Sequence, residues 1–172
     1  MKKILSTLIG MAMAIGAMGS AFAGDMINGA GATFPYPLYS AWAFAYEKET
    51  GIKLNYQSIG SGGGVRQVAS RTVDFGASDD ALKPEDIEKD KLLQWPQVIG
   101  GEVLAINIPG IKSEEMILAG ETVGKIYLGV IKKWNDPAIK ALNPNLNLSD
   151  QDITVVHRSD GSGTTAVFTH YL

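Results

Sequence analysis

Small, hydroxyl-bearing residues recur beside glycines at three places in this chain. The three segments are residues 29–34 (GAGATF), 60–64 (GSGGG) and 160–165 (DGSGTT). Each follows a segment with strand character and precedes one with helical character. Such a turn directs backbone N–H groups and the positive end of a helix dipole toward one point. Because serine and threonine hydroxyls add further donors, the recurring pattern favours the binding of an anion.

Each segment alone is also explained by a tight strand-to-helix turn with a capping hydroxyl, but three in one short chain favour a binding site. The known nucleotide-binding patterns do not fit. Residues 60–64 are followed by Val65 and Arg66 and not by a P-loop lysine, and residues 29–31 lack the third glycine of a dinucleotide fingerprint. We therefore expect no cofactor, and we see no cluster of residues that suggests a metal site.

The elements around these turns alternate along the chain, which predicts an α/β fold with a largely parallel sheet. Expected strands and helices are bounded by glycine and proline turn signals. The strands are expected at residues 26–30, 52–58, 73–77, 98–99, 103–108 and 153–157. The helices are expected at residues 37–50 (closed by Gly51), 65–70, from Pro84 onward, 123–134, 137–142 and 163–172.

The N-terminus has the pattern of a cleaved export signal. Lys2 and Lys3 precede an apolar stretch over residues 4–19, and residues 21–23 form an A-x-A cleavage site. The chain contains no cysteine for a disulfide or a lipid anchor. We therefore expect a periplasmic protein cleaved after Ala23, without a direct membrane anchor.

The overall charge makes nucleic acid an unexpected partner. The chain has 15 Lys and Arg against 18 Asp and Glu, and loss of Lys2 and Lys3 with the signal leaves 13 against 18, a formal charge of −5. Binding to a phosphate backbone requires a basic face. Any anion site here must depend on local dipoles, because the net charge of the protein repels the ligand.

Four ordered motifs carry a specific resemblance to a known family. They are residues 29–35 (GAGATFP), 55–63 (NYQSIGSGG), 73–79 (VDFGASD) and 158–164 (RSDGSGT). In these motifs, and over residues 27–172 as a whole, the chain resembles the periplasmic phosphate-binding proteins of the ABC-type phosphate importer. The resemblance implies a protein that captures inorganic phosphate and delivers it to the membrane subunits of the importer, without catalysis.

The same resemblance implies a two-lobed periplasmic binding protein fold of type II, with the ligand in a cleft between the lobes. Residues 1–23 are then the signal peptide, 24–109 the first α/β lobe and 110–172 the start of the second. The family is about twice as long as this chain, so we expect the second lobe to be incomplete, the first to lack its C-terminal return, and phosphate binding to be weakened.

The resemblance also implies which residues bind phosphate. Arg158 supplies a guanidinium that matches two phosphate oxygens, and Asp160 could hold that guanidinium in place or cap a turn. The Asp79 carboxylate repels an anion unless the ligand carries a proton, as phosphate does and sulfate does not. Asp80 and Gly62 depart from the family pattern at this site. The full expected set is Thr33, Phe34 (through its backbone), Ser61, Asp79, Arg158, Ser162, Gly163 and Thr164.

Two other functions stay open at this point. A hydrolase or phosphate-transferring enzyme could use Ser61 or Ser162 as a nucleophile with His157 or His170 as a base, although no G-x-S-x-G segment is present. A binder of sulfate or molybdate is also conceivable, but it would need neutral donors without Asp79. The aromatic residues over residues 34–46 are best explained by packing within the lobe.

Overall fold

The computed structural model describes residues 26–172. The expected export signal over residues 1–23 and its cleavage site lie outside this part of the chain. Within the described part, no helix has the length and apolar character needed to cross a membrane.

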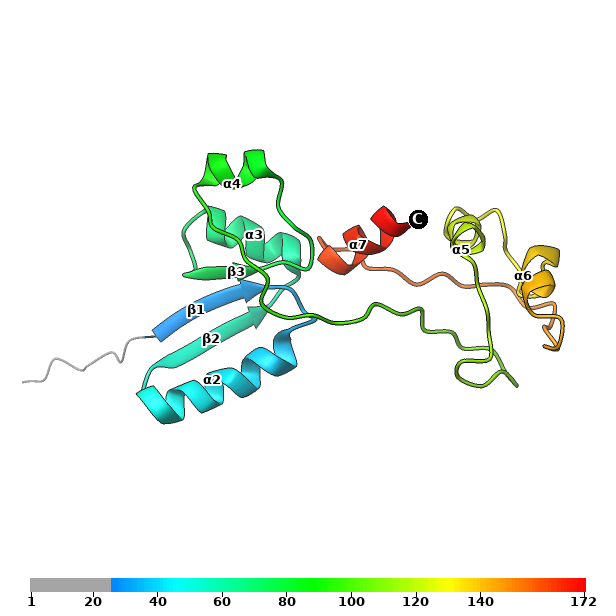
Figure 1. The fold of residues 1–172 in the computed structure, drawn as a ribbon, viewed down its shortest axis with the longest axis horizontal. Coiled ribbons are helices and arrows are strands. Elements are labelled where there is room, and N and C mark those ends of the chain that lie inside the picture. The colour runs from blue at the N-terminus through cyan, green and yellow to red at the C-terminus, as the bar shows by residue number, and fades with distance from the viewer. Residues whose placement is uncertain (1–25) are drawn as a thin grey trace, which may run out of the picture.

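A three-stranded parallel sheet forms the first part of the fold (Figure 1). Its strands are β1 (Met26–Gly31), β2 (Lys53–Ser58) and β3 (Phe75–Ala77), in the order β2-β1-β3. The connecting helices α2 (Tyr36–Thr50) and α3 (Ser61–Ala69) lie on opposite faces of the sheet (Figure 1). This follows because the crossover from β1 to β2 and the crossover from β2 back past β1 to β3 run in opposite directions across the sheet, and both are expected to be right-handed. The carboxyl ends of all three strands therefore meet at one edge, with β1 at the reversal of strand order.

The first helix follows its sequence signals closely. α2 has a proline in its first turn and ends at Gly51, which has a φ of 75° and donates its N–H to the Glu47 carbonyl over 2.8 Å. A left-handed glycine is a common helix end, since it lacks the steric penalty of a Cβ. The prediction of a helix over residues 37–50 closed by Gly51 is confirmed to within one residue.

The glycine segment at residues 60–64 is different from the prediction. We expected a loop with a helix from Val65, but α3 already begins at Ser61. Of its glycines, Gly60 has a positive φ of 81°. Gly64 lets the backbone of α3 lie close to the backbone of β1, because a Cβ on Gly64 would overlap the Cα of Gly31. The glycines thus allow the first turn of α3 to lie directly against the central strand.

Three expected strands do not form. Residues 98–99, 103–108 and 153–157 lack ladder pairing within residues 26–172, and the nearest feature is an isolated bridge between Lys133 and Asp152. β3 is also shorter than expected. Ile99 is 96% exposed and Val103 is 86% exposed. These segments therefore have the apolar pattern of strands, but no neighbouring strand pairs with them or covers their side chains within residues 26–172. The helix predicted from Pro84 is present as α4 (Pro84–Asp90).

A second group of elements packs around α5 (Gly120–Tyr127) and α6 (Pro137–Leu142). The helix predicted over residues 123–134 ends early, and Gly129 follows with a φ of 70°. α6 has its predicted bounds, and the Asp136 carboxylate caps it by accepting the Ala138 N–H over 2.9 Å. Its buried core consists of Ile126, Ile131, Ile139 and Leu148.

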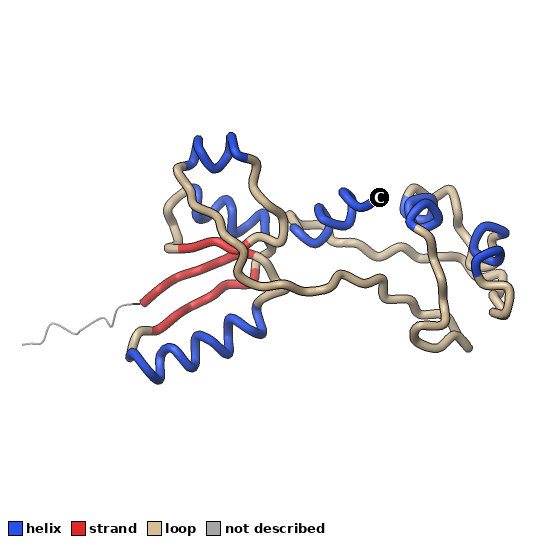
Figure 2. Tube along the Cα trace, viewed as in Figure 1, coloured by secondary structure: helices blue, strands red, loops and turns tan. Residues whose placement is uncertain are grey.

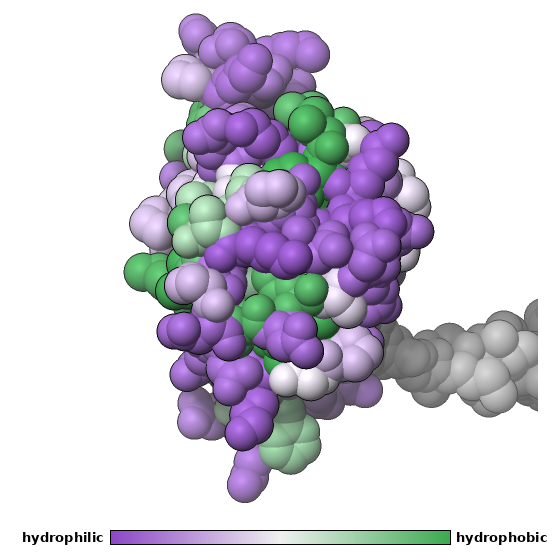
Figure 3. Space-filling model, turned by 90° about the vertical axis from the view of Figure 1, so that its right-hand side faces the viewer, coloured by the Kyte–Doolittle hydropathy of each residue, from purple (hydrophilic) through white to green (hydrophobic). Residues whose placement is uncertain are grey.

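Two long loop segments join these two parts of the structure (Figure 2). One leads from α4 to α5, and the other returns from the α6 region to α7 (Gly163–Tyr171), which lies between the two parts (Figure 1). On the face at the α5–α6 end, apolar areas lie scattered among polar ones (Figure 3). The α/β class with a parallel sheet is confirmed.

Candidate functional site

The start of α7 reaches the carboxyl edge of the sheet and contacts the loop that follows β3. There the Thr164 hydroxyl donates to the Asp79 carboxylate over 2.8 Å. The Asp79 N–H donates to the Ser61 hydroxyl over 3.2 Å, and Ser61 is only 4% exposed. A Cβ on Gly163 would lie 2.5 Å from the Ser61 Oγ and 2.9 Å from the Asp79 Cβ. Four of the expected site residues are therefore in mutual contact.

Two helices begin at this point. α3 starts at Ser61 and α7 at Gly163, and the Gly62 N–H donates to the Gly161 carbonyl over 2.9 Å, which ties the two starts together. The first N–H groups of a helix have no partner within that helix. Their partial positive charge, added to that of the helix dipole, is directed at the region around Asp79. Ser162 caps α7 by accepting the Thr165 N–H over 3.2 Å.

Arg158 and Asp160 form a two-point ion pair beside the start of α3. The Arg158 Nε donates to Asp160 Oδ1 over 2.6 Å, and the Nη2 group donates to Oδ2. A Cβ on Gly60 would lie 3.2 Å from the Arg158 Nη2, which places the pair close to the glycine that precedes Ser61. The guanidinium keeps the remaining N–H donors of its fork.

The ion pair changes the acidity of both of its members. The hydrogen bond from Arg158 lowers the pKa of the Asp160 carboxyl below its usual range. The hydrogen bond to Asp160 raises the pKa of Arg158, and the negative charges of Asp160 and Asp79 act in the same direction. Arg158 is thus within electrostatic reach of Asp79.

Thr33 and Phe34 lie in the turn between β1 and α2. The Thr33 carbonyl accepts the Tyr36 N–H over 3.2 Å, and Phe34 is 44% exposed. A Cβ on Gly100 would overlap the Phe34 ring, so residues of the long α4–α5 loop pass against it. The structure places both residues at the same carboxyl edge of the sheet, but it does not join them by a hydrogen bond to Asp79 or Thr164.

Two tyrosines near the site were not among the expected site residues. Burial raises the pKa of Tyr39, and the Asp79 charge adds to the effect. The pKa of Tyr56 is raised by burial first and then by Tyr39 and Asp79. Tyr56 donates its hydroxyl to the Ala32 carbonyl over 2.7 Å. In the sequence, Tyr56 follows the alternating pattern of a strand and lies within the motif of residues 55–63, but neither feature indicates its contact with the β1–α2 turn.

The arrangement offers backbone N–H groups, hydroxyls and the Arg158 guanidinium in the neighbourhood of the Asp79 carboxylate. Such a set can hold an anion that brings its own proton for Asp79. Within residues 26–172, neither histidine forms a hydrogen bond with Ser61 or Ser162: the His157 Nδ1 lies 2.9 Å from the Arg158 carbonyl oxygen, and His170 is in the last turn of α7. The described residues also include no group of three or more carboxylates and histidines placed to hold a metal ion.

Comparisons with known proteins agree on the family. The phosphate-binding protein PstS of Haemophilus influenzae is 58% identical over 148 residues, covering 86% of this chain and 44% of that protein. PstS of Pasteurella multocida is 58% identical over 146 residues, covering 85% and 42%. The chain thus spans less than half the length of these relatives.

Among solved structures, the fold matches that of a substrate-binding protein from Clostridium perfringens, assigned to a phosphate ABC transporter and determined with bound phosphate. The match has a TM-score of 0.62 at 21% identity and covers 85% of this chain and 55% of that one. A family model described as a PBP superfamily domain matches residues 16–172. This chain belongs to the PBP superfamily.

Proposed function

We propose that this chain is the phosphate-binding portion of a periplasmic solute-binding protein that delivers inorganic phosphate to an ABC-type importer. The observation that carries the proposal is the position of Asp79, a carboxylate held between Ser61, Thr164 and the starts of two helices. Donors alone suit many anions. A carboxylate among them suits an anion that is still protonated near neutral pH, which is the case for phosphate.

The residue roles follow from this geometry. Arg158, oriented by its ion pair with Asp160, contributes positive charge, and the Ser61 hydroxyl, which accepts the Asp79 N–H, can donate its own proton to a phosphate oxygen. The Thr164 hydroxyl donates its one proton to Asp79, so Thr164 offers phosphate its backbone N–H at the start of α7. Asp79 accepts the ligand proton. The proposed set of phosphate ligands is Thr33, Phe34, Ser61, Asp79, Arg158, Ser162, Gly163 and Thr164.

Sulfate or molybdate is the competing ligand. Both are fully ionised near neutral pH and would place an oxygen lone pair against the Asp79 carboxylate without a proton between them. A site built around a ligand hydroxyl rejects an analogue that lacks it by about 10⁴ to 10⁵. The Asp79 position therefore favours phosphate over these two anions.

The location and organisation of the protein are part of the same proposal. The chain is exported to the periplasm after cleavage behind Ala23, binds phosphate without transforming it, and presents it to the membrane subunits of the importer. The lobes are residues 24–109 and 110–172, with the ligand held where α7 meets the first lobe. The relatives at 58% identity carry the name phosphate-binding protein, which supports binding and not catalysis as the activity.

A calorimetric titration of the chain with inorganic phosphate tests the proposal. The expected result is saturable heat with one phosphate bound per chain. A matched titration of Ser61→Ala should show weaker binding, because that variant removes a buried donor at the start of α3. Absence of saturable binding in a chain whose circular dichroism shows it to be folded would contradict the proposal.

A further inference from the structure

The hydroxyl of Tyr56 is bonded to the backbone just before the Thr33–Phe34 turn. Tyr56 lies in β2, and its Oη donates to the Ala32 carbonyl over 2.7 Å. Ala32 is 1% exposed, so its carbonyl is removed from water and needs a partner from the protein. Tyr56 supplies that partner from a side chain.

The backbone of the sheet leaves this carbonyl to Tyr56. The β1–β2 ladder ends with the pair Gly31 and Ser58, one residue before Ala32. On its other side Ala32 is fixed to β3, since its N–H donates to the Ala77 carbonyl over 2.9 Å. Both polar groups of Ala32 are therefore held, one by a strand and one by the Tyr56 hydroxyl.

Fixing the Ala32 carbonyl also fixes the N–H that follows it. A trans peptide is planar and directs its C=O and N–H to opposite sides. With the Ala32 carbonyl directed at Tyr56, the Thr33 N–H must be directed away from Tyr56. Among residues 26–172, no backbone carbonyl accepts this N–H.

We propose that Tyr56 is a positioning residue for the phosphate site: its hydroxyl sets the plane of the Ala32–Thr33 peptide so that the Thr33 N–H is available to the anion. The inference rests on the proposed function, because it assigns the N–H to the same ligand. It adds a residue that touches no ligand atom and acts through the backbone of the turn.

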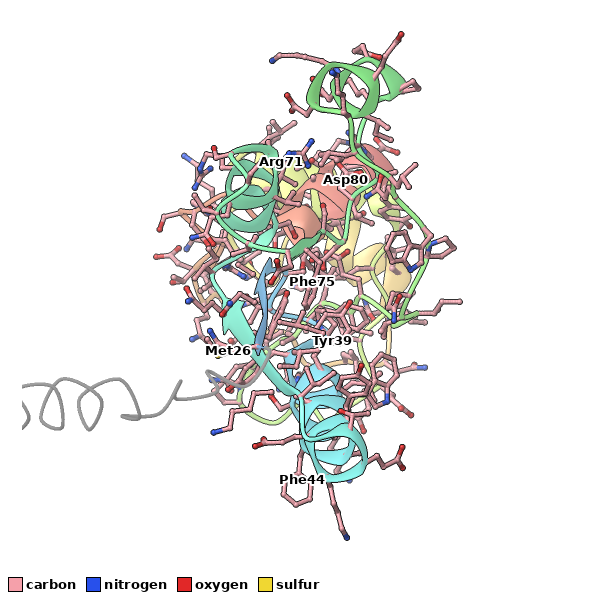
Figure 4. All side chains as sticks on the ribbon, turned by 90° about the vertical axis from the view of Figure 1, so that its left-hand side faces the viewer. Met26, Tyr39, Phe44, Arg71, Phe75 and Asp80 are labelled. Carbon is pink, nitrogen blue, oxygen red and sulfur yellow. The ribbon has the colours of Figure 1, made fainter. Side chains whose placement is uncertain are left out.

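The Tyr56 ring is held firmly enough for this role. It stacks on Phe75 with a centroid distance of 5.9 Å and an interplanar angle of 18°, and it meets Tyr39 edge to face at 4.9 Å and 89°. Tyr36 stacks on it as well, at 6.4 Å. Figure 4 shows Tyr39 and Phe75, which reach this cluster from α2 and β3. Packing on several sides leaves the hydroxyl little freedom to move away from Ala32.

The hydroxyl also keeps its proton across the neutral range. Burial raises the pKa of Tyr56, and the nearby Asp79 charge acts in the same direction. Tyr56 is therefore a donor wherever phosphate binding would be measured. The effect of the Asp79 charge on Tyr56 agrees with a position of Tyr56 close to the proposed site.

Tyr56→Phe tests the inference, with Tyr39→Phe as the matched control. Both changes remove one hydroxyl from the same half-buried aromatic cluster, but no hydrogen bond from the Tyr39 hydroxyl is seen within residues 26–172. Calorimetry with inorganic phosphate should show affinity reduced about two- to tenfold in Tyr56→Phe, as expected for one lost hydrogen bond, and unchanged in Tyr39→Phe. Thermal unfolding checks that both variants are folded.

A second measurement reads the peptide plane without any ligand. The residual dipolar coupling of the Thr33 N–H reports the direction of that bond, and it should change in Tyr56→Phe but not in Tyr39→Phe. An unchanged coupling, or a changed coupling with unaltered phosphate affinity, would overturn the inference. If the unaltered chain does not bind phosphate at all, the proposed function fails instead, while the coupling still decides whether Tyr56 sets the peptide.

Discussion

The Thr164 hydroxyl donates to the Asp79 carboxylate over 2.8 Å, although 85 residues separate the two in the sequence. This bond joins the start of α7 to the loop after β3. An ionised carboxylate has about four acceptor positions, so Asp79 can hold Thr164 and still accept a proton from a ligand. The contact therefore holds α7 against the β3 loop and leaves acceptor positions of the Asp79 carboxylate free for a ligand.

Gly163→Ala should destabilise the chain and separate Thr164 from Asp79. The added Cβ would lie 2.9 Å from the Asp79 backbone nitrogen, so α7 must move away. We expect a loss of about 1–3 kcal/mol in the free energy of unfolding, as for other overpacked positions. Urea unfolding measures it.

Gly124→Ala is the matched control, because Gly124 is also in a helix and has no atom within 4 Å of an added Cβ. There alanine should stabilise by about 0.5–1 kcal/mol through its higher helix propensity. Equal stabilisation by both substitutions would show that α7 does not lie tightly against Ser61 and Asp79.

Arg158→Ala should weaken phosphate binding about 10- to 100-fold, the range expected for a hydrogen bond to a charged group. Arg71→Ala is the comparison, since the Arg71 guanidinium donates to the Asp90 carbonyl over 2.8 Å, at the end of α4. Calorimetry should find an affinity close to that of the unaltered chain in Arg71→Ala. If Arg158→Ala and Arg71→Ala bind phosphate equally, Arg158 is not a ligand.

The pKa of Asp160 should rise in Arg158→Ala. The hydrogen bond from Arg158 is the main cause that lowers this pKa from its ordinary value of 3.8. A lowered pKa means that the pair favours the folded state above the unfolded-state pKa, and that this contribution is lost as the pH falls through the folded-state value.

Titration of the Asp160 carboxyl carbon by NMR measures the change directly. In Arg158→Ala it should titrate near its ordinary value, and in Arg66→Ala it should keep its lowered value. A lowered pKa that persists without Arg158 would mean that another group holds the Asp160 charge.

Asn143→Ala should destabilise the region around α5 and α6. Asn143 is 4% exposed; its amide donates to the Ile117 carbonyl over 2.7 Å and to the Ile139 carbonyl over 2.9 Å, and its oxygen accepts the Ile117 N–H over 2.7 Å. Loss of the side chain removes the partner of the buried Ile139 carbonyl and of the half-buried Ile117 N–H and carbonyl, which costs about 1–3 kcal/mol. Asn147→Ala, at an exposed position, should stay within about 0.5 kcal/mol in the same denaturant titration. Equal effects would contradict a structural role for Asn143.

The helices were the most predictable part of the fold. α2 and α6 carry their own start and stop signals, such as Gly51 and Asp136, which act over one turn of helix. The strands expected near Val103 and Val156 depended on distant partners, and the alternating pattern of a segment does not say whether a partner exists. The early start of α3 depended on Gly64 packing against β1, which is also a tertiary effect.

The proposed site shows the same division. The motifs at residues 60–64, 73–79 and 158–164 indicated which residues belong together, and the structure places Ser61, Asp79 and Thr164 in contact. Tyr56 could not be predicted, because its role depends on the end of the β1–β2 ladder and on the direction of one carbonyl. The direction of a single backbone carbonyl cannot be predicted from the residue types around it.

The preference between phosphate and sulfate tests whether Asp79 selects the ligand. Asp79 makes a ligand proton necessary, so calorimetric titration near neutral pH should show binding of phosphate and no measurable binding of sulfate. In Asp79→Asn the amide can donate to an unprotonated oxyanion, and the preference should narrow by about tenfold or more. Equal binding of phosphate and sulfate by the unaltered chain would contradict the proposed phosphate site, because the Asp79 carboxylate would then not select the ligand.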